Sequence, residues 1–162
     1  MKTLNGLPAH VLLVHAIVVL LPLAAILLVV NALWPAARRK LAGPAAGLSV
    51  LVAVLVPITI NAGEWLQAHV APTPLVRDHA ELGKTAAFVA IPVAILSLLV
   101  WWRHREELRG ARGARTFLAP AATWVTVVLA VLSIVAAGAA GYDVYRIGDS
   151  GAQASWHGQF RG

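Results

Sequence analysis

Histidine is the residue type in this chain with the widest chemistry, because imidazole binds haem iron, copper and zinc and titrates near neutral pH. The sequence has 162 residues and six histidines. Only His104 lies at one end of the apolar segments. The other five, at the opposite end, are His10, His15, His69, His79 and His157. A one-sided group of this kind indicates a binding site at that end.

The segments that must position these histidines are strongly apolar. Apolar residues make up 59% of the chain and charged residues only 12%. Four runs approach or exceed the ~20 apolar residues that a membrane-spanning helix requires. We therefore predict an all-α integral membrane four-helix bundle in residues 1–145, followed by a polar outer tail in residues 146–162. The predicted spans are 11–34, 44–65, 79–102 and 117–142.

The basic residues predict the orientation of the bundle. Lysine and arginine in short loops stay on the cytoplasmic side. The clusters at 38–40 and 103–115 follow the first and third spans, whereas the opposite end has only scattered basic residues. Both termini and the histidines should then face outward. This sorting explains the net charge of +6, which therefore does not indicate nucleic-acid binding.

Cysteine is absent from the sequence. Disulfides, iron–sulfur ligation, thiolate catalysis and covalent attachment of c-type haem are therefore excluded. Gly148-Asp149-Ser150-Gly151 matches a short motif around the nucleophile of serine proteases. A catalytic triad also needs a base and an oxyanion hole on a scaffold, and we expect Ser150 in the exposed tail. The sequence therefore does not favour an enzyme, and we predict no catalytic residue.

Two local signals predict helix boundaries. Gly43 and Pro44 indicate a tight inner turn before the second span. Asp78 and Glu81 have the spacing of a capping box, with Asp78 as the N-cap. The third helix should then begin at His79, where the helix dipole disfavours imidazolium and leaves a neutral ring able to bind a metal.

The depth of each polar group decides which of them can meet. At 1.5 Å per residue, His15 and Glu64 lie about 30 Å from the inner ends of their helices. By the same count His10, His69 and His79 lie about 36 Å out, at the rim. His10 and His15 are five residues apart, so they point to different neighbours.

His15 and Glu64 are the first polar groups to consider inside the spans, because ionisable residues there are costly and usually functional. The carboxylate could orient the imidazole, as in many metal sites. The alternative is a mutually satisfied polar pair that fixes the register of two helices. At the rim, depth favours His10 with His79. The candidate cofactor-binding residues are His10, His15, Glu64 and His79, and the candidate metal ligands are His10, His15, His69 and His79.

Several motifs of the sequence occur together in one known family: Asn5-Gly6-Leu7-Pro8-Ala9-His10, His15, Glu64-Trp65, His79 and Arg146-Ile147-Gly148-Asp149-Ser150-Gly151-Ala152. In these motifs the chain resembles a bacterial membrane family catalogued as domain of unknown function 2231. Val11, Ala16 and Ile17 depart from the family, which often has proline just after each of the first two histidines. The resemblance covers nearly the whole chain and implies a bacterial inner-membrane protein, in a family with no established activity. Some relatives are joined to c-type cytochrome or Rieske domains, which implies a place in membrane electron transfer.

Three functions follow as expectations. The first is an accessory of membrane electron transfer that binds a b-type haem, or alternatively copper or zinc, through the outer histidines. The second is a non-catalytic partner of a respiratory-chain or other membrane complex, with no cofactor. The third is a proton-linked transporter that uses His15 and Glu64 as a relay.

Overall fold

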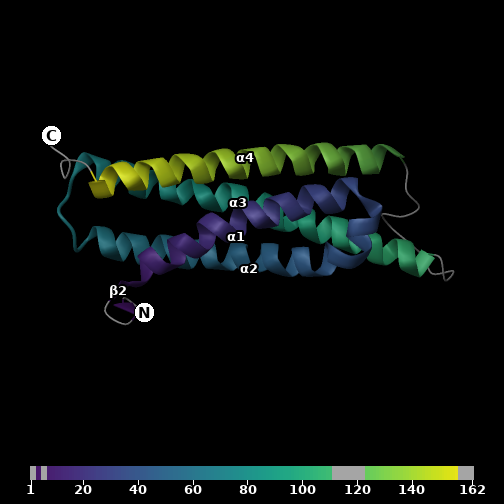
Figure 1. The fold of residues 1–162 in the computed structure, drawn as a ribbon, viewed down its shortest axis with the longest axis horizontal. Helices are drawn as coiled ribbons and strands as arrows, with labels where there is room; N and C mark the ends of the chain where they lie inside the picture. Colours follow the sequence, from purple (N-terminus) through teal and green to yellow (C-terminus); the bar gives the residue numbers. More distant parts are fainter. Residues whose placement is uncertain (1–2, 5–6, 111–122, 157–162) are drawn as a thin grey trace.

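The computed structural model describes residues 3–4, 7–110 and 123–156. These residues form four long helices and a short hairpin (Figure 1). All four helices are long and apolar enough to cross a membrane. The prediction of an all-α four-helix bundle is confirmed. The elements are β1 (Thr3–Leu4), antiparallel to β2 (Leu7–Pro8), then α1 (Ala9–Leu33), α2 (Pro35–Gln67), α3 (Pro74–Gly110) and α4 (Thr123–Trp156).

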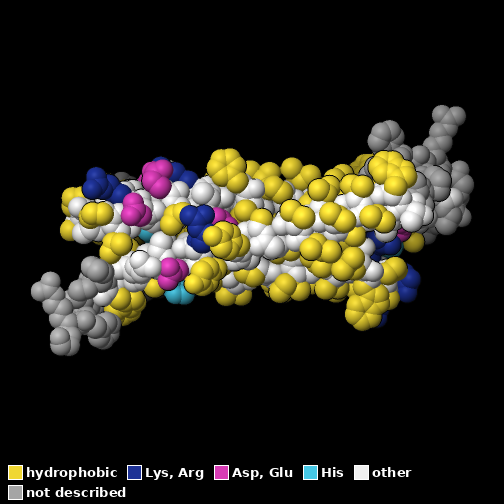
Figure 2. Space-filling model, turned by 90° about the horizontal axis from the view of Figure 1, so that it is seen from above, with side chains coloured by type: hydrophobic (Ala, Val, Ile, Leu, Met, Phe, Trp, Pro, Cys, Tyr) yellow, Lys and Arg dark blue, Asp and Glu magenta, His cyan; other side chains and the backbone are white. Residues whose placement is uncertain are grey.

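Successive helices run in opposite directions, so α1 begins and α4 ends at the same end of the bundle (Figure 1). We call this the histidine end, because it holds His10 and His79, and the opposite end, with Arg38 and Arg103, the basic end. Hydrophobic side chains cover most of the length between the ends on the face shown in Figure 2. The centre of the bundle is filled by fully buried aliphatic side chains, which include Leu21, Leu28, Val52, Val56 and Val93.

The turn between α1 and α2 lies at Trp34, so the predicted turn at Gly43-Pro44 is wrong. Trp34 has an extended backbone with φ −117° and ψ 102°. Pro35 then starts α2 at the position where its missing N–H costs nothing. Helix α2 continues through Pro44, and the basic residues 38–40 therefore lie on a helix.

Helix α3 begins at Pro74 rather than at His79. The cap is Thr73, whose Oγ1 accepts a hydrogen bond from the backbone N–H of Val76 at 3.2 Å. A threonine N-cap followed by proline at the first helical position is a strong start signal, and it comes before the predicted cap at Asp78. His79 consequently lies in the second turn of α3 and not at its N-terminus.

Helix α4 extends well beyond the predicted end of the fourth span. The first six residues of that predicted span, 117–122, lie outside the described residues. Residues 146–156, predicted as part of a polar tail, continue the helix. The glycines in this segment do not end α4, because one face of the extension packs against α3 at the histidine end.

The basic end contains buried charges that join three helices. Arg103 of α3 is only 2% exposed. Its Nη2 donates a hydrogen bond to Thr126 Oγ1 of α4 at 2.7 Å, and its Nε lies 3.6 Å from Glu107 Oε1. The same carboxylate oxygen lies 3.9 Å from Nη2 of Arg38 on α2. This part of the predicted basic loop is therefore packed into the bundle.

Candidate functional site

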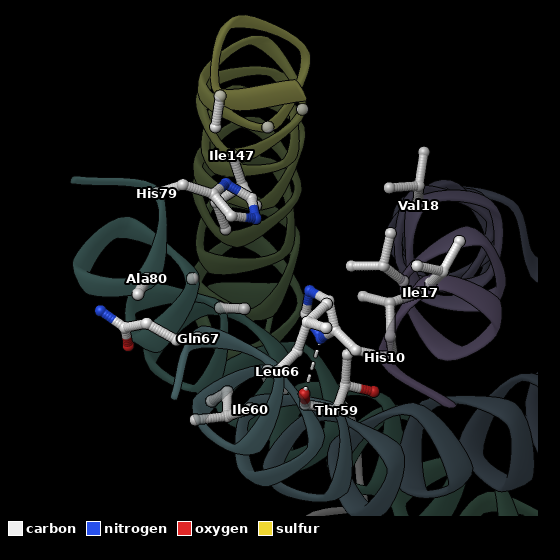
Figure 3. Close-up of a pocket in the computed structure, with 18 of the residues that line it drawn as sticks. His10, Ile17, Val18, Thr59, Ile60, Leu66, Gln67, His79, Ala80 and Ile147 are labelled. Atoms are coloured by element: carbon white, nitrogen blue, oxygen red, sulfur yellow. Dashed lines mark hydrogen bonds between the residues drawn. The ribbon is translucent and has the colours of Figure 1, made fainter. Parts of the chain in front are cut away.

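A cavity of about 570 Å³ lies at the histidine end and is lined by residues of all four helices. Most of its lining is aliphatic. Its polar lining residues include His10 and His15 of α1, Glu64 of α2 and His79 of α3. The volume falls within the range of small-molecule and cofactor sites, roughly 300–1,000 Å³. Figure 3 shows the rings of His10 and His79 projecting into the same space from different helices.

One ring nitrogen of His10 is held by helix α2. The Nδ1 atom lies 3.0 Å from the backbone carbonyl oxygen of Thr59 (dashed line in Figure 3). A carbonyl oxygen only accepts, so Nδ1 carries the hydrogen. In the neutral ring Nε2 then has a free lone pair. Gly63 makes room for this ring, because a Cβ at that position would lie 2.9 Å from His10 Cε1.

His79 is held in the same manner by helix α4. Its Nδ1 lies 2.9 Å from Ser150 Oγ. The Ser150 hydroxyl donates its one hydrogen to the carbonyl oxygen of Ile147 at 2.9 Å. It must therefore accept from His79 Nδ1–H, which again leaves Nε2 as the free acceptor. A Cβ at Gly151 would lie 3.0 Å from His79 Cε1, so this ring also rests against a glycine.

The two imidazoles lie at a separation suited to one metal centre. Their ring centres are 6.3 Å apart and the ring planes are inclined by 72°. An imidazole nitrogen binds a metal at about 2.0–2.1 Å and the ring centre lies about 1.1 Å beyond, so two rings on opposite sides of one ion have centres roughly 6 Å apart. Histidine ligands usually donate their second ring N–H to a neighbouring acceptor. His10 and His79 both fit this pattern.

His15 and Glu64 line the same cavity, but their side chains are oriented differently from the predicted pair. His15 is exposed, and its Nδ1 lies 2.6 Å from the carbonyl oxygen of Val11 on its own helix. Glu64 is also exposed, and Lys84 of α3 is near enough to interact with it electrostatically. The hydrogen bond of His15 therefore lies within α1 and does not join α1 to α2.

The other predicted ligands lie apart from the two rings. His69 is exposed just after the end of α2, and its Nδ1 lies 2.8 Å from the carbonyl oxygen of Trp65. Its ring centre lies 4.3 Å from that of Trp65, and His69 does not line the cavity. His157 falls outside the described residues. Within the described ranges, no group of three or more histidine, aspartate or glutamate side chains could hold a metal ion.

Four residues that support the two rings were not predicted. Thr59 and Ser150 provide the acceptors, and Gly63 and Gly151 provide the space. The tetrapeptide Gly148-Asp149-Ser150-Gly151 contained a signal, since two of its members contact His79. This motif supports an imidazole, a role that neither its match to a protease motif nor its place in the family resemblance predicted.

Comparison with family models, curated proteins and solved structures finds no match to this chain. The resemblance to domain of unknown function 2231 therefore stays a prediction. The fold and the cavity define the class: a four-helix bundle with four candidate membrane spans and, near one end, a cavity lined by three histidines, two of which face each other.

Proposed function

We propose that this protein is a multi-pass protein of the bacterial cytoplasmic membrane that holds a b-type haem between His10 and His79, as an accessory of membrane electron transfer. The observation that carries the proposal is the pair of anchored imidazoles with ring centres 6.3 Å apart. Each ring has a fixed Nδ1–H and presents Nε2 as a ligand. Bound haem would supply a centre that accepts and returns one electron.

The number of protein ligands favours haem over a bare ion. Zinc sites take three or four protein ligands, whereas haem iron needs only two axial ligands because the macrocycle supplies the others. Two histidines from α1 and α3 meet at the cavity, and the described residues contain no larger cluster of metal-binding side chains. Copper or zinc therefore has less support here than haem.

The distribution of charge favours an outer location for the cavity. Basic residues concentrate at the opposite end, on α2 near residues 38–40 and on α3 near Arg103 and Arg105. That end should lie at the cytoplasm, where it could also contact anionic lipid headgroups. The termini and the cavity would then lie at the outer face.

The proposal is tested by purifying the full chain in mild detergent from cells supplied with a haem precursor. We expect a Soret band in the absorption spectrum and a shift of the visible bands on reduction. His10→Ala and His79→Ala should each weaken the Soret band and shift it to the position of haem with one axial imidazole, whereas His69→Ala, at an exposed histidine outside the cavity, should leave the band unchanged. A wild-type protein with no Soret band, even after addition of haemin, would contradict the proposal.

A second candidate function is that of a non-catalytic partner in a larger membrane complex, and the surface of α4 supports it. Of the residues in the apolar segment of α4, 11% are buried, compared with 28–33% in the apolar segments of the other three helices. Val131, Ile134 and Val135 are exposed on it. A photo-crosslinker at Ile134 should capture a membrane protein if this face binds a partner. Adducts with lipid alone would contradict it.

A further inference from the structure

An ionisable side chain that the proposed function does not use lies between α3 and α4. Asp143 of α4 is only 7% exposed. Its Oδ1 lies 2.6 Å from Thr85 Oγ1 of α3. Val144, the next residue of α4, and Ile147, one turn further toward the histidine end, line the cavity, as do Gly83 and Ala86 on either side of Thr85. Asp143 is therefore packed directly behind the cavity wall.

The hydrogen bonds of Thr85 require one more hydrogen than the hydroxyl can supply. Thr85 Oγ1 lies 2.7 Å from the carbonyl oxygen of Leu82 as well as 2.6 Å from Asp143 Oδ1. A threonine hydroxyl has a single hydrogen, and neither a carbonyl oxygen nor a carboxylate oxygen has one to give. If Asp143 were ionised, one of these short contacts would join two acceptors. A protonated Asp143 that donates to Thr85, which donates to Leu82, satisfies both contacts.

Among the residues that the structure describes, Thr85 is the one hydrogen-bond partner of the Asp143 carboxyl group. Its Oδ2 is buried and has no hydrogen-bond partner within the part of the chain that the structure describes. The nearest cations along the two helices are engaged elsewhere. Arg146 is exposed and lies over the ring of Tyr142, and Lys84 is paired with Glu81 at 2.7 Å. Burying a charge that has no counter-charge beside it is costly, and the hydrogen count at Thr85 is consistent with a neutral side chain.

We propose that Asp143 is a proton-binding site, held as a neutral carboxylic acid that donates to Thr85. The inference rests on the hydrogen count and on burial, and it does not depend on what occupies the cavity. Release of this proton would place a negative charge directly behind the cavity wall. Asp143 therefore provides an exchangeable proton next to the proposed cofactor, from a position where intramembrane acids are usually functional.

The test is infrared spectroscopy of the purified full chain near neutral pH. We expect a carboxylic acid C=O stretching band that shifts when water is replaced by D₂O. Asp143→Asn should abolish this band, and the neutral amide should leave the fold intact. Asp149→Asn is the matched control: Asp149 lies on the same helix but is exposed and accepts a hydrogen bond from Gln153, so its removal should leave the band in place.

A second variant keeps the proposal testable if Asp143→Asn does not fold. Thr85→Val removes the acceptor of the proposed hydrogen bond, so the Asp143 band should persist at a higher wavenumber. A wild-type spectrum in which Asp143→Asn removes only carboxylate bands would overturn the proposal. A carboxylic acid band that Thr85→Val leaves unmoved would overturn the assigned hydrogen bond.

Discussion

The imidazoles of His10 and His79 are each fixed at two points, one hydrogen bond and one glycine. The Nδ1 contacts reach across to Thr59 on α2 and Ser150 on α4. These contacts fix which nitrogen carries the hydrogen, and the glycines fix where the ring lies. Both rings are thus positioned before any ligand binds, which reduces the entropic cost of binding.

The glycines provide the most direct test of this positioning. Gly63→Ala places a Cβ 2.9 Å from Cε1 and Nδ1 of His10, so the ring must shift. We expect at least about a tenfold loss of haemin affinity, because displaced ligands no longer match the metal geometry. The measurement is a haemin titration of the detergent-purified protein. Gly138→Ala, where an added Cβ meets nothing within 4 Å, should bind as the wild type does, and equal affinity in both variants would refute the role of Gly63.

The hydroxyl of Ser150 gives a second prediction at the residue scale. Ser150→Ala removes the acceptor for His79 Nδ1–H, and loss of such supporting partners typically costs about 10–100-fold in metal affinity. The same titration should show a loss in this range. Ser133→Ala is the matched control, because Ser133 is also on α4 but its hydroxyl only donates to Leu129 of its own helix. A Ser150→Ala protein that binds haemin as tightly as this control would contradict the assignment.

Part of this site could be predicted from the sequence. Counting residues along the spans placed His10 and His79 at the same depth, and the structure brings their rings together. The direction in which a side chain points around its helix could not be obtained in this way. That is why the local hydrogen bond of His15 to Val11 was not predicted. Asp143 was not predicted as a site residue, because it is distinguished by its buried contact with Thr85 and not by its position relative to other polar residues in the sequence.

At the scale of the elements, hydropathy predicted the four helices and local signals misplaced their ends. Pro44 was read as a helix break, but proline is tolerated inside apolar helices when neighbours satisfy the freed carbonyl. The segment 146–156 was read as a tail because of its glycines, yet Gly151 packs against His79. A glycine that ends a helix and a glycine that admits a neighbouring ring have the same appearance in a sequence.

The packing of α2 against α3 yields a prediction at this scale. Ser49 and Ser97 are buried and their hydroxyl oxygens lie 2.9 Å apart. Because Ser49 donates to the carbonyl oxygen of Ala45, Ser97 must donate to Ser49. A double-mutant cycle with Ser49→Ala and Ser97→Ala should give a coupling free energy of about 0.6 kcal/mol, the average for such pairs in membrane proteins. Unfolding equilibria in detergent measure it.

A matched cycle makes the result of that experiment decisive. Ser49→Ala combined with Ser133→Ala joins two buried serines with separate backbone partners. Their effects should add, because distant sites without shared partners are independent. Coupling that is no larger for Ser49 with Ser97 than for this control pair would mean that the interhelical hydrogen bond contributes nothing.

For the whole molecule, the separation of basic residues from the histidines predicts an orientation in the membrane. The sequence has no cysteine, so single cysteines can report on each side. Ala71→Cys, in the exposed α2–α3 loop at the histidine end, should react in intact spheroplasts with a thiol reagent that cannot cross the membrane. Ala36→Cys, exposed at the basic end, should react only after permeabilisation. The reverse pattern would place the cavity at the cytoplasm.

The central claim is that His10 and His79 together bind one haem, and electron paramagnetic resonance of the haem-loaded ferric protein tests it most directly. Two axial imidazoles predict a low-spin signal in the wild-type protein. Removal of one ligand, by His10→Ala or by His79→Ala, should convert it to a high-spin signal. A low-spin signal that survives both substitutions, or a wild-type protein that is high-spin from the start, would contradict ligation by these two residues.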